Sequence, residues 1–360
     1  MKKTKVYLTL QNSDVFEGYR FGADGEITGE LVFSTGMVGY VETLTDPSNY
    51  GQIVVQTFPL IGNYGVNRKD MESEKTHVSA FVVREICNDP SNFRMEEELN
   101  SFMKEQGVIG IYGVDTRRLT KVLREEGVMT ARISNKPLSF EAFEDLTDYS
   151  IKNAVQAVSS TQTQTFGEEN SQYTVALWDM GAKNSTIASL IEKGCRVVKL
   201  PACASVEQIL SVGADGIMIS DGPGDPEENK DVIAKIKDIL GKTPIFGVGL
   251  GHQLLALAFG AETYKRKCGH RGSNQPVKCL TNGKVYISTQ NHGYDLLPET
   301  IQKGKISFVN VNDGSCEGID YDDQKAFGVQ FVPETCVAGT TENPLYEKFF
   351  AMMKKEKENA

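Results

Sequence analysis

Long hydrophobic runs are missing from this sequence, and none approaches the roughly 18 apolar residues that a membrane-spanning helix needs. The beginning, MKKTKVYLTLQNSDVFEG, has lysines but no apolar segment after them, so we expect no signal peptide. Positive charge is in deficit, because 38 Lys and Arg stand against 48 Asp and Glu, a formal net charge of −10. This balance argues against nonspecific binding to nucleic acid or to an anionic membrane.

Metal and nucleotide motifs are also missing. The seven cysteines are scattered, odd in number and never spaced as Cys-X-X-Cys. This usage favours a reduced cytoplasmic protein over a disulfide framework or a zinc site, and we expect no metal in this chain. The glycine-rich loop SDGPGDP (220–226) has no Gly-Lys-Ser/Thr, so it is not a Walker A loop.

Histidine is scarce, and the four present give no obvious catalytic pair. We expect His77 to lack a chemical neighbourhood and His252 to have a capping or packing role. His270 falls in a predicted Gly/Arg/Asn-rich turn, and His292 in a predicted polar loop after a strand. None occurs beside a thiol or hydroxyl with an obvious orienting carboxylate, and sequence spacing alone does not exclude a pairing in space.

The length of 360 residues suggests two domains. Residues 1–150 alternate short strands and tight loops with two predicted helices, 96–105 and 116–126. Residues 151–173, rich in Ser, Thr, Gln and Asn, are predicted to be a linker. In residues 174–360 strands alternate with helices, which predicts an α/β domain with a mostly parallel sheet flanked by helices. Residues 1–150 are predicted to form a smaller α/β domain. In mostly parallel sheets ligands bind at the carboxyl ends of the strands, which here are followed by loops 179–184, 221–226 and 249–253.

The second helix of the N-terminal half has one strongly basic face. Its apolar residues fall on one side, and the opposite side carries Arg117, Arg118, Lys121 and Arg124. This pattern is typical of a solvated helix face, and the alternative is contact with an acidic partner.

The C-terminal half is organised around residues 244–260, PIFGVGLGHQLLALAFG. The pattern predicts a buried strand (245–248), a glycine-rich turn (249–251) and an apolar helix from His252. Such an elbow raises its tip beside the unpaired N–H groups of the helix, where an anionic centre can be held. The tip is Gly249, which has no side chain to act as a nucleophile.

Two further segments could bind a ligand. In the SDGPGDP loop, Gly222 and Gly224 allow close backbone approach, although GPG is also a common structural turn. In VQFVPE (329–334), the carboxylate of Glu334 follows a buried strand. It could orient a base or bind a ligand, or simply lie in water.

Taken together, these segments resemble the small chain of carbamoyl phosphate synthetase over nearly the whole sequence. The N-terminal half carries FSTGMVGYVETLTDPSNYGQIV, PLIGNYGVN, SNFR and DTRRLTKVLREEG. The C-terminal half carries the class I glutamine amidotransferase pattern in SDGPGDP, IFGVGLGHQLLALAFG, TQNHGYDL and VQFVPE. The resemblance implies a chain that hydrolyses glutamine and passes ammonia to a separate large chain. The N-terminal domain would contact that large chain, which would bind the ATP and Mg²⁺, so no cofactor is expected here.

The resemblance also implies a catalytic triad that this chain does not complete. The family has a cysteine between Val248 and Leu250 and a histidine between Phe331 and Pro333; this sequence has Gly249 and Val332. Only the carboxylate, Glu334, remains. The family's glutamine-holding positions are better kept, and they fall on Ser48, Gly222, Gly224, Leu250, Gln253, Asn291, Gly293 and Tyr294.

By the same resemblance, the N–H groups of Leu250 and Gly222 would form the oxyanion hole. Two departures affect this region. Asp221 replaces the usual asparagine, and TCVAGTTEN follows Glu334 in place of an Ala-Ser-Pro-Gly-Pro run.

Three hypotheses about function follow. The first is a small chain that has lost glutaminase activity and supports carbamoyl phosphate formation from ammonia by its large chain, because a glycine cannot form a thioester. The second is an active glutaminase with a relocated nucleophile, Cys336 near Glu334 or Cys268 near His270. The third is a regulatory module that senses glutamine without hydrolysing it. The resemblance does not decide between pyrimidine and arginine biosynthesis.

Overall fold

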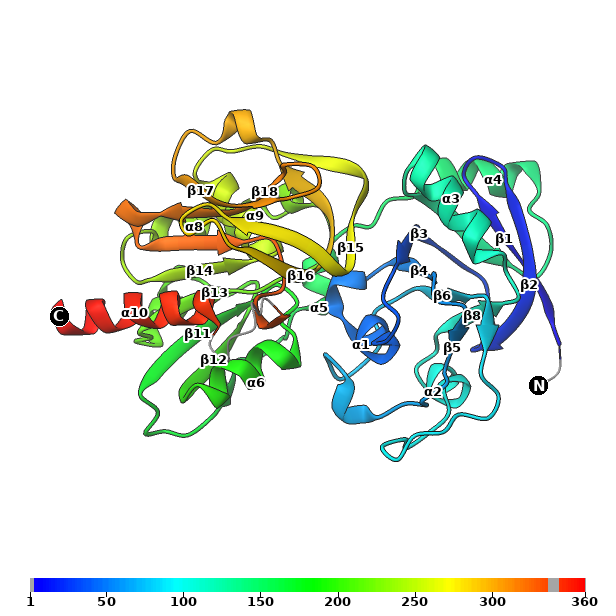
Figure 1. The fold of residues 1–360 in the computed structure, drawn as a ribbon, viewed down its shortest axis with the longest axis horizontal. Helices are drawn as coiled ribbons and strands as arrows, with labels where there is room; N and C mark the ends of the chain where they lie inside the picture. The colour runs from blue at the N-terminus through cyan, green and yellow to red at the C-terminus, as the bar shows by residue number, and fades with distance from the viewer. Residues whose placement is uncertain (1–2, 336–342, 360) are drawn as a thin grey trace. The chain divides into compact units, whose positions relative to one another are not determined.

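The computed structural model of this chain describes residues 3–335 and 343–359. The chain divides into two compact units, Met1–Lys152 and Asn153–Ala360 (Figure 1). Within the described residues, the longest apolar helical stretches fall short of what a membrane crossing requires.

The N-terminal unit is built on a closed seven-stranded barrel with the strand order β1-β2-β8-β6-β4-β3-β9. Its strands are β1 (Lys5–Leu10), β2 (Val15–Gly22), β3 (Ile27–Ser34), β4 (Gln52–Gln56), β6 (Ala80–Val83), β8 (Ile109–Tyr112) and β9 (Met129–Ser134). The two-residue strands β5 (Leu60–Ile61) and β7 (Glu85–Ile86) pair separately. Closure pairs the first strand of the barrel with the last and gives the barrel a continuous apolar interior.

The described residues of this unit form four helices: α1 (Tyr40–Thr45), α2 (Leu99–Glu105), α3 (Thr116–Glu126) and α4 (Phe140–Thr147). The bounds of α3 match the predicted range. Its apolar side is anchored by Leu119 and Leu123, which are fully buried in the barrel core. Its first turn is capped by Asp115, whose side chain accepts a hydrogen bond from the Arg118 N–H.

The C-terminal unit is built on a ten-stranded sheet with the order β10-β12-β11-β13-β14-β19-β18-β17-β15-β16. Its strands are β10 (Gln164–Phe166), β11 (Tyr173–Asp179), β12 (Cys195–Pro201), β13 (Gly216–Ile219), β14 (Ile245–Val248), β15 (Thr263–Cys279), β16 (Val285–Leu296), β17 (Lys305–Asn310), β18 (Cys316–Tyr321) and β19 (Ala326–Val329). The predicted parallel arrangement is confirmed for β12, β11, β13, β14 and β19. The outer strands pair antiparallel.

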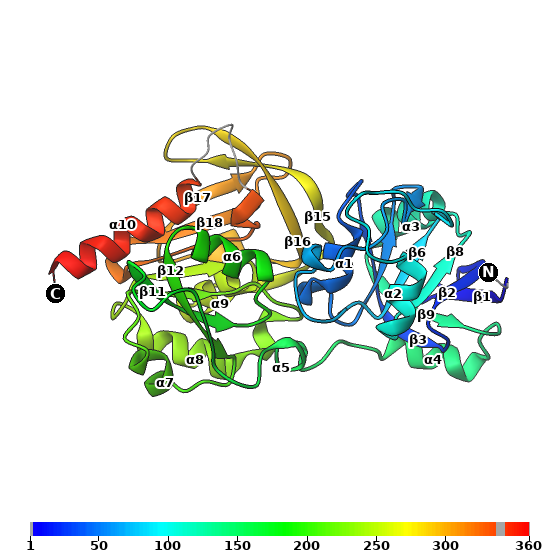
Figure 2. The same cartoon turned by 90° about the horizontal axis from the view of Figure 1, so that it is seen from below.

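Helices cover both faces of the parallel strands (Figure 2). They are α5 (Ala154–Val158), α6 (Asn184–Glu192), α7 (Val206–Ser211), α8 (Lys230–Ile239), α9 (Leu250–Ala258) and α10 (Pro344–Asn359). In β13, Ile217 and Ile219 pack with α8 and α9, whereas Met218 packs on the opposite face with residues of α6 and α10. This alternation explains why a parallel strand buried on both faces consists entirely of apolar residues and glycine.

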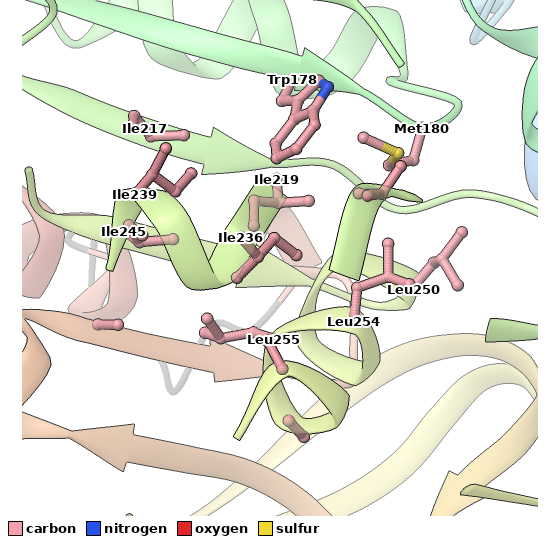
Figure 3. Packing of buried hydrophobic residues seen from close by; sticks show 14 of the residues in the cluster. Trp178, Met180, Ile217, Ile219, Ile236, Ile239, Ile245, Leu250, Leu254 and Leu255 are labelled. Carbon is pink, nitrogen blue, oxygen red and sulfur yellow. The ribbon is translucent and has the colours of Figure 1, made fainter. Parts of the chain in front are cut away.

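Figure 3 shows the core beneath the elbow helix, where side chains from the sheet and from α8 and α9 point toward one another. Trp178, Ile219, Ile236 and Leu254 are each 0% exposed in this cluster. The indole N–H of Trp178 donates to the Ala202 carbonyl at 3.2 Å, so its single polar atom is satisfied. The elbow therefore rests on a tightly packed base.

Two parts of the C-terminal half differ from the sequence prediction. Most of the segment predicted as a linker, 151–173, lies within the second unit: α5 places Val155 in the core, and β10 pairs with β12. The predicted turn around His270 and the predicted loop around His292 lie inside β15 and β16. Buried polar side chains in these strands hide the alternation of apolar residues that would have identified them.

Candidate functional site

The elbow has the geometry expected of a nucleophile position. Gly249 lies between β14 and α9 with φ 53° and ψ −113°, a conformation that strains any residue with a side chain. Its N–H donates to the Val329 carbonyl at the end of β19 at 2.9 Å, and the Gly251 N–H donates to the Ser220 carbonyl at 3.1 Å. The helix begins at Leu250, two residues before the predicted start. The backbone of the elbow is thus fixed to both neighbouring strands.

The two N–H groups assigned to an oxyanion hole already have an acceptor. Asp221 Oδ1 accepts from the Gly222 N–H at 2.8 Å and from the Leu250 N–H at 3.0 Å. A Cβ atom built on Gly249 would lie 2.1 Å from that same oxygen. The Asp221 carboxylate therefore lies beside the position where a nucleophilic side chain would begin. The sequence drew attention to Asp221 only as a departure from the usual asparagine.

The loops after β11 and β13 also meet here, as their positions at the carboxyl ends of parallel strands predict. A Cβ on Gly222 would lie 2.2 Å from the Met180 carbonyl oxygen, and one on Gly224, at φ +89°, would lie 2.8 Å from the Ala154 side chain. Both positions consequently require glycine for packing reasons. Their assignment to glutamine binding stays a prediction.

The end of β19 brings the two positions predicted to complete a triad beside the elbow strand, because β14 and β19 pair in parallel. Val332 is half-buried, and its N–H donates to the Thr289 carbonyl at 2.9 Å. Glu334 lies in the 3₁₀ turn Pro333–Thr335, and its Oε1 accepts from the Tyr346 hydroxyl at 2.8 Å. The hydrogen bond from Tyr346 fixes the Glu334 carboxylate, as expected of a group that orients a catalytic base. The neighbouring Val332, however, has no imidazole ring for it to orient.

Tyr346 is held protonated by its surroundings, which keeps it a donor to Glu334. Burial raises its pKa well above the usual value, and the negative charge of Glu334 adds to this effect. The second oxygen of Glu334, Oε2, is buried and lacks a hydrogen-bond partner within the described part of the chain.

Four further predicted glutamine positions come from α9 and β16. Gln253 is 3% exposed, and its Nε2 donates to the Tyr294 carbonyl at 2.7 Å and to Gln330 Oε1 at 2.9 Å. Asn291, Gly293 and Tyr294 lie in β16, opposite β15. The Gln253 bonds attach this strand to the elbow helix, so these four predicted positions belong to one connected region.

Ser48, the eighth predicted glutamine position, belongs to the N-terminal unit. It lies in the 3₁₀ turn Pro47–Asn49, where its hydroxyl donates to Asp46 Oδ1 at 2.7 Å. Asp46 also accepts from the Ser48 N–H at 2.9 Å, which fixes the turn. Its part in glutamine binding stays a prediction.

Beside the predicted glutamine positions on β16 lies a buried polar cluster that sequence reasoning missed. His270 of β15 pairs in register with His292 of β16, and the ring centroids are 5.0 Å apart. His270 Nε2 lies 2.9 Å from Asp313 Oδ2, and its Nδ1 lies 3.4 Å from Glu317 Oε1. Glu317 is 0% exposed and also accepts from Gln290 Nε2 at 2.9 Å.

The two histidines of this cluster have opposite charge preferences. Burial alone would lower the pKa of His270, but the neighbouring carboxylates of Glu317 and Asp313 outweigh it and raise that pKa. Burial lowers the pKa of His292 well below its usual value, and the nearby His270 lowers it further. The surroundings therefore favour the protonated form of His270 and the neutral form of His292.

Three atoms of this cluster, from His270, His292 and Glu317, lie within 4.8 Å of one another, a spacing compatible with a metal ion. Protein groups already contact these atoms. Glu317 accepts from two amides and faces His270, while His292 contacts the Tyr294 carbonyl at 2.9 Å and Gln290 Oε1 at 3.2 Å. The arrangement is an internal network of hydrogen bonds and ion pairs, in which the contact of His270 Nδ1 with Glu317 is an ion pair and not a hydrogen bond.

His252 has the packing role expected from the sequence. It is 0% exposed on α9, and burial lowers its pKa to about 3, so it is neutral at physiological pH. Neither ring nitrogen has a hydrogen-bond partner among the described residues. A Cβ on Gly328 of β19 would lie 2.7 Å from His252 Nδ1, which shows how closely the ring packs against the sheet.

Cys336 and Cys268 are the two alternative nucleophiles that the sequence suggests. Cys336 lies outside the described residues. Cys268 is half-buried on β15, two residues from His270, but both ring nitrogens of His270 face carboxylates. A histidine engaged in this way is not placed to activate the Cys268 thiol.

A concave surface lies on the N-terminal unit, along α3. Basic residues outnumber acidic ones in its lining, which consists of Arg84, Arg117, Arg118, Lys121 and Arg124 with Asp115, Glu125 and neighbouring Thr and Pro residues. Arg118 packs over the Phe16 ring, with its guanidinium carbon 5.1 Å from the ring centroid. The basic helix face expected from the sequence thus lines a groove.

Comparison with known proteins covers both units. Residues 8–133 match the family model "Carbamoyl-phosphate synthase small chain, CPSase domain", and residues 176–352 match "Glutamine amidotransferase class-I". The carbamoyl phosphate synthase small chains of Clostridium perfringens and Bacillus cereus are each 44% identical to this chain, over 96% and 97% of it and 98% and 96% of their own lengths. The Staphylococcus epidermidis small chain is 43% identical over 98% of both chains. The chain belongs to the carbamoyl phosphate synthase small-chain family and contains a class I glutamine amidotransferase domain.

Proposed function

We propose that this chain acts as the small subunit of a carbamoyl phosphate synthase without hydrolysing glutamine itself. The observation that carries the proposal is the elbow: a glycine occupies the strained tip, and a carboxylate occupies the two N–H donors beside it. Without a thiolate at position 249 no acyl-enzyme can form there. Binding and oxyanion stabilisation alone would leave at most about 10³–10⁴-fold acceleration over water.

In this proposal the large chain makes carbamoyl phosphate from bicarbonate, ATP and free ammonia, in pyrimidine or arginine biosynthesis in the cytoplasm. The ATP and Mg²⁺ would be bound by the large chain. The small chain would contribute its contacts with that partner and a glutamine-shaped pocket without a nucleophile.

The test is synthesis by the reconstituted two-chain complex. We expect carbamoyl phosphate from ammonium at a substantial rate and none above background from glutamine. Adding an independent glutaminase to the glutamine reaction should restore synthesis, which shows that the large chain is competent. Glutamine-dependent synthesis without that addition, at a rate near the ammonium-dependent one, would refute the proposal.

A second candidate function is glutamine sensing, and the connected frame around Gln253 favours it. That frame joins α9 to β16 through the Tyr294 carbonyl, so predicted ligand-holding positions are kept without the reactive ones. Isothermal titration calorimetry with glutamine, on the chain alone and in the complex, tests this function. A flat titration in both would remove it.

For the partner surface we propose the basic groove along α3. Its charge suits an acidic patch on the large chain, consistent with the basic helix face. Arg117→Glu should weaken association with the large chain about threefold, since an exposed charge contributes modestly. Lys237→Glu, at an exposed position of α8, makes the same charge change elsewhere and should leave association unaltered. Equal effects of the two variants in a binding titration would contradict the assignment.

A further inference from the structure

We propose that Asp221 is an internal occupant of the oxyanion hole and forms a third barrier to glutamine hydrolysis, separate from the missing cysteine and histidine. The inference rests on the proposed absence of glutaminase activity and names the residue that keeps it absent. It predicts that restoring the two missing side chains alone does not restore the reaction.

One oxygen atom of Asp221 already occupies both predicted oxyanion-hole donors. Asp221 Oδ1 accepts both N–H groups that would hold the negatively charged oxygen of a tetrahedral intermediate, at 2.8 Å from Gly222 N and 3.0 Å from Leu250 N. Leu250 is the first residue of the nine-residue helix α9, where N–H groups without intrahelical partners favour an anion. A carboxylate held by two such donors makes charge-assisted bonds, which are stronger than those of a neutral acceptor.

The same oxygen also excludes a side chain at position 249 on steric grounds. The Cβ of any side chain at position 249 would lie 2.1 Å from Asp221 Oδ1 and 2.4 Å from its Cγ. Contacts under 3.0 Å force one group to move. A cysteine at this position and the present Asp221 conformation are therefore incompatible, whereas Gly249 accommodates it.

The Asp221 carboxylate would also disfavour the charged form of a nucleophile at position 249. Amide hydrolysis needs a thiolate, which attacks the glutamine side-chain carbonyl carbon and forms a C–S bond while the C=O electron pair moves to the oxygen. The adduct then expels ammonia, which takes a proton from the histidine, and water later cleaves the thioester to release glutamate and the thiol. A carboxylate against the sulfur raises the pKa of the thiol and opposes the first step. If the Asp221 side chain rotates to admit the sulfur, its carboxylate stays in the same loop beside the two donors, where it competes with the oxyanion that forms next.

The experiment compares two restored enzymes. The double variant Gly249→Cys/Val332→His is expected to release glutamate from glutamine at the background rate of the parent chain. Adding Asp221→Asn should raise this rate by about 100-fold or more, because losing one oxyanion-hole donor already costs about 10²–10³ in kcat. The matched control adds Asp225→Asn instead, which changes a carboxylate of the same loop that caps Glu227 N and not the two donors. That control should remain at the level of the double variant.

A second readout does not require turnover. The thiol introduced by Gly249→Cys is alkylated over a range of pH, with and without Asp221→Asn in the same chain, and the modified peptide is quantified by mass spectrometry. The half-maximal pH should be lower by about one unit or more when Asp221→Asn is present, because the opposing carboxylate is gone. Thermal unfolding checks that both variants are folded.

Two results would overturn the assignment of Asp221: identical alkylation profiles, or a double variant that turns over as fast as the triple. Glutaminase activity in the unaltered chain would refute the proposed function instead, so the two failures are distinguishable.

Discussion

The elbow at Gly249 and the polar cluster on β15 and β16 belong to the same sheet but are held in different ways. Backbone hydrogen bonds fix the elbow, whereas contacts between side chains hold the polar cluster together. At the elbow the backbone is fixed, with the N–H of Gly249 bonded to Val329, while the predicted nucleophile and base positions carry glycine and valine. In the polar cluster the side chains themselves are interlocked, and Glu317 is contacted by Gln290, Asn310 and His270. A reactive side chain points into a site and has few structural partners. A buried polar group is the partner of several others, so its loss leaves each of them unsatisfied.

The largest effect is therefore expected in the polar cluster and not at the elbow. Glu317→Ala should lower the free energy of unfolding by about 3–5 kcal/mol, because two buried amides lose their acceptor and His270 loses one of its two carboxylate partners. Glu317→Gln keeps the shape and one acceptor oxygen and should cost less. Urea unfolding followed by fluorescence measures both. A loss below about 1 kcal/mol for Glu317→Ala, the worth of one ordinary hydrogen bond, would show that the cluster is not a structural network.

The pH dependence of stability separates histidines that are buried with and without partners. The folded pKa of His252 is about 3 against 6.5 in the unfolded chain, so the unfolded state binds a proton first as pH falls. The stability that neutral His252 contributes is present above about pH 6.5 and declines toward pH 3, with a loss of about 2 kcal/mol by pH 5. Denaturant midpoints measured from pH 7 to pH 5 should fall accordingly, and His252→Leu should flatten that slope.

His270 gives the opposite sign in the same protein. Its folded pKa is raised, so its contribution is fully present below about pH 6.5 and is lost as pH rises through the folded value. His270→Gln should therefore be less stable than the parent chain chiefly on the acidic side, with the difference narrowing at alkaline pH. A difference that widens with rising pH would contradict the ion pairs with Asp313 and Glu317.

The sequence predicted the elbow better than the polar cluster for a physical reason. The strand 245–248 is an apolar run bounded by Pro244 and Gly249, and its predicted and observed bounds agree. Period and punctuation suffice for such an element. The bounds of α3 were predicted equally well, because its buried and exposed faces differ sharply in polarity.

The polar cluster had no comparable signal. The sequence pattern predicts a turn at His270 and a loop at His292, because polar residues in a strand look like exposed loop residues when their buried partners are unknown. Asp313 lies 43 residues beyond His270, and single-sequence patterns carry no information on such pairings. Asp221 was visible as a departure from the family, but its contact with the Leu250 N–H depends on the close approach of two loops.

The smallest expected effect is the coupling between Gly249 and Asp221 in the free energy of unfolding. Gly249→Ala should destabilise the chain for two reasons, the positive φ at this position and the 2.1 Å approach of the new Cβ to Asp221 Oδ1. In an Asp221→Ala background only the first reason remains. A double-mutant cycle on unfolding free energies should therefore give a coupling of about 1 kcal/mol between the two positions.

Gly260→Ala is the matched control for this cycle. Gly260 also has a positive φ, +93°, but a Cβ there meets no described atom within 4 Å, so its cost reports backbone strain alone. It should show no coupling to Asp221, since the carboxylate oxygen is bonded at the start of α9 and Gly260 follows the end of that helix. Additive effects at 249 and 221 would mean that the carboxylate moves aside freely. The elbow would then be a vacant nucleophile site and not one closed by its own side chain, which would also weaken the case for Asp221 as a barrier to hydrolysis.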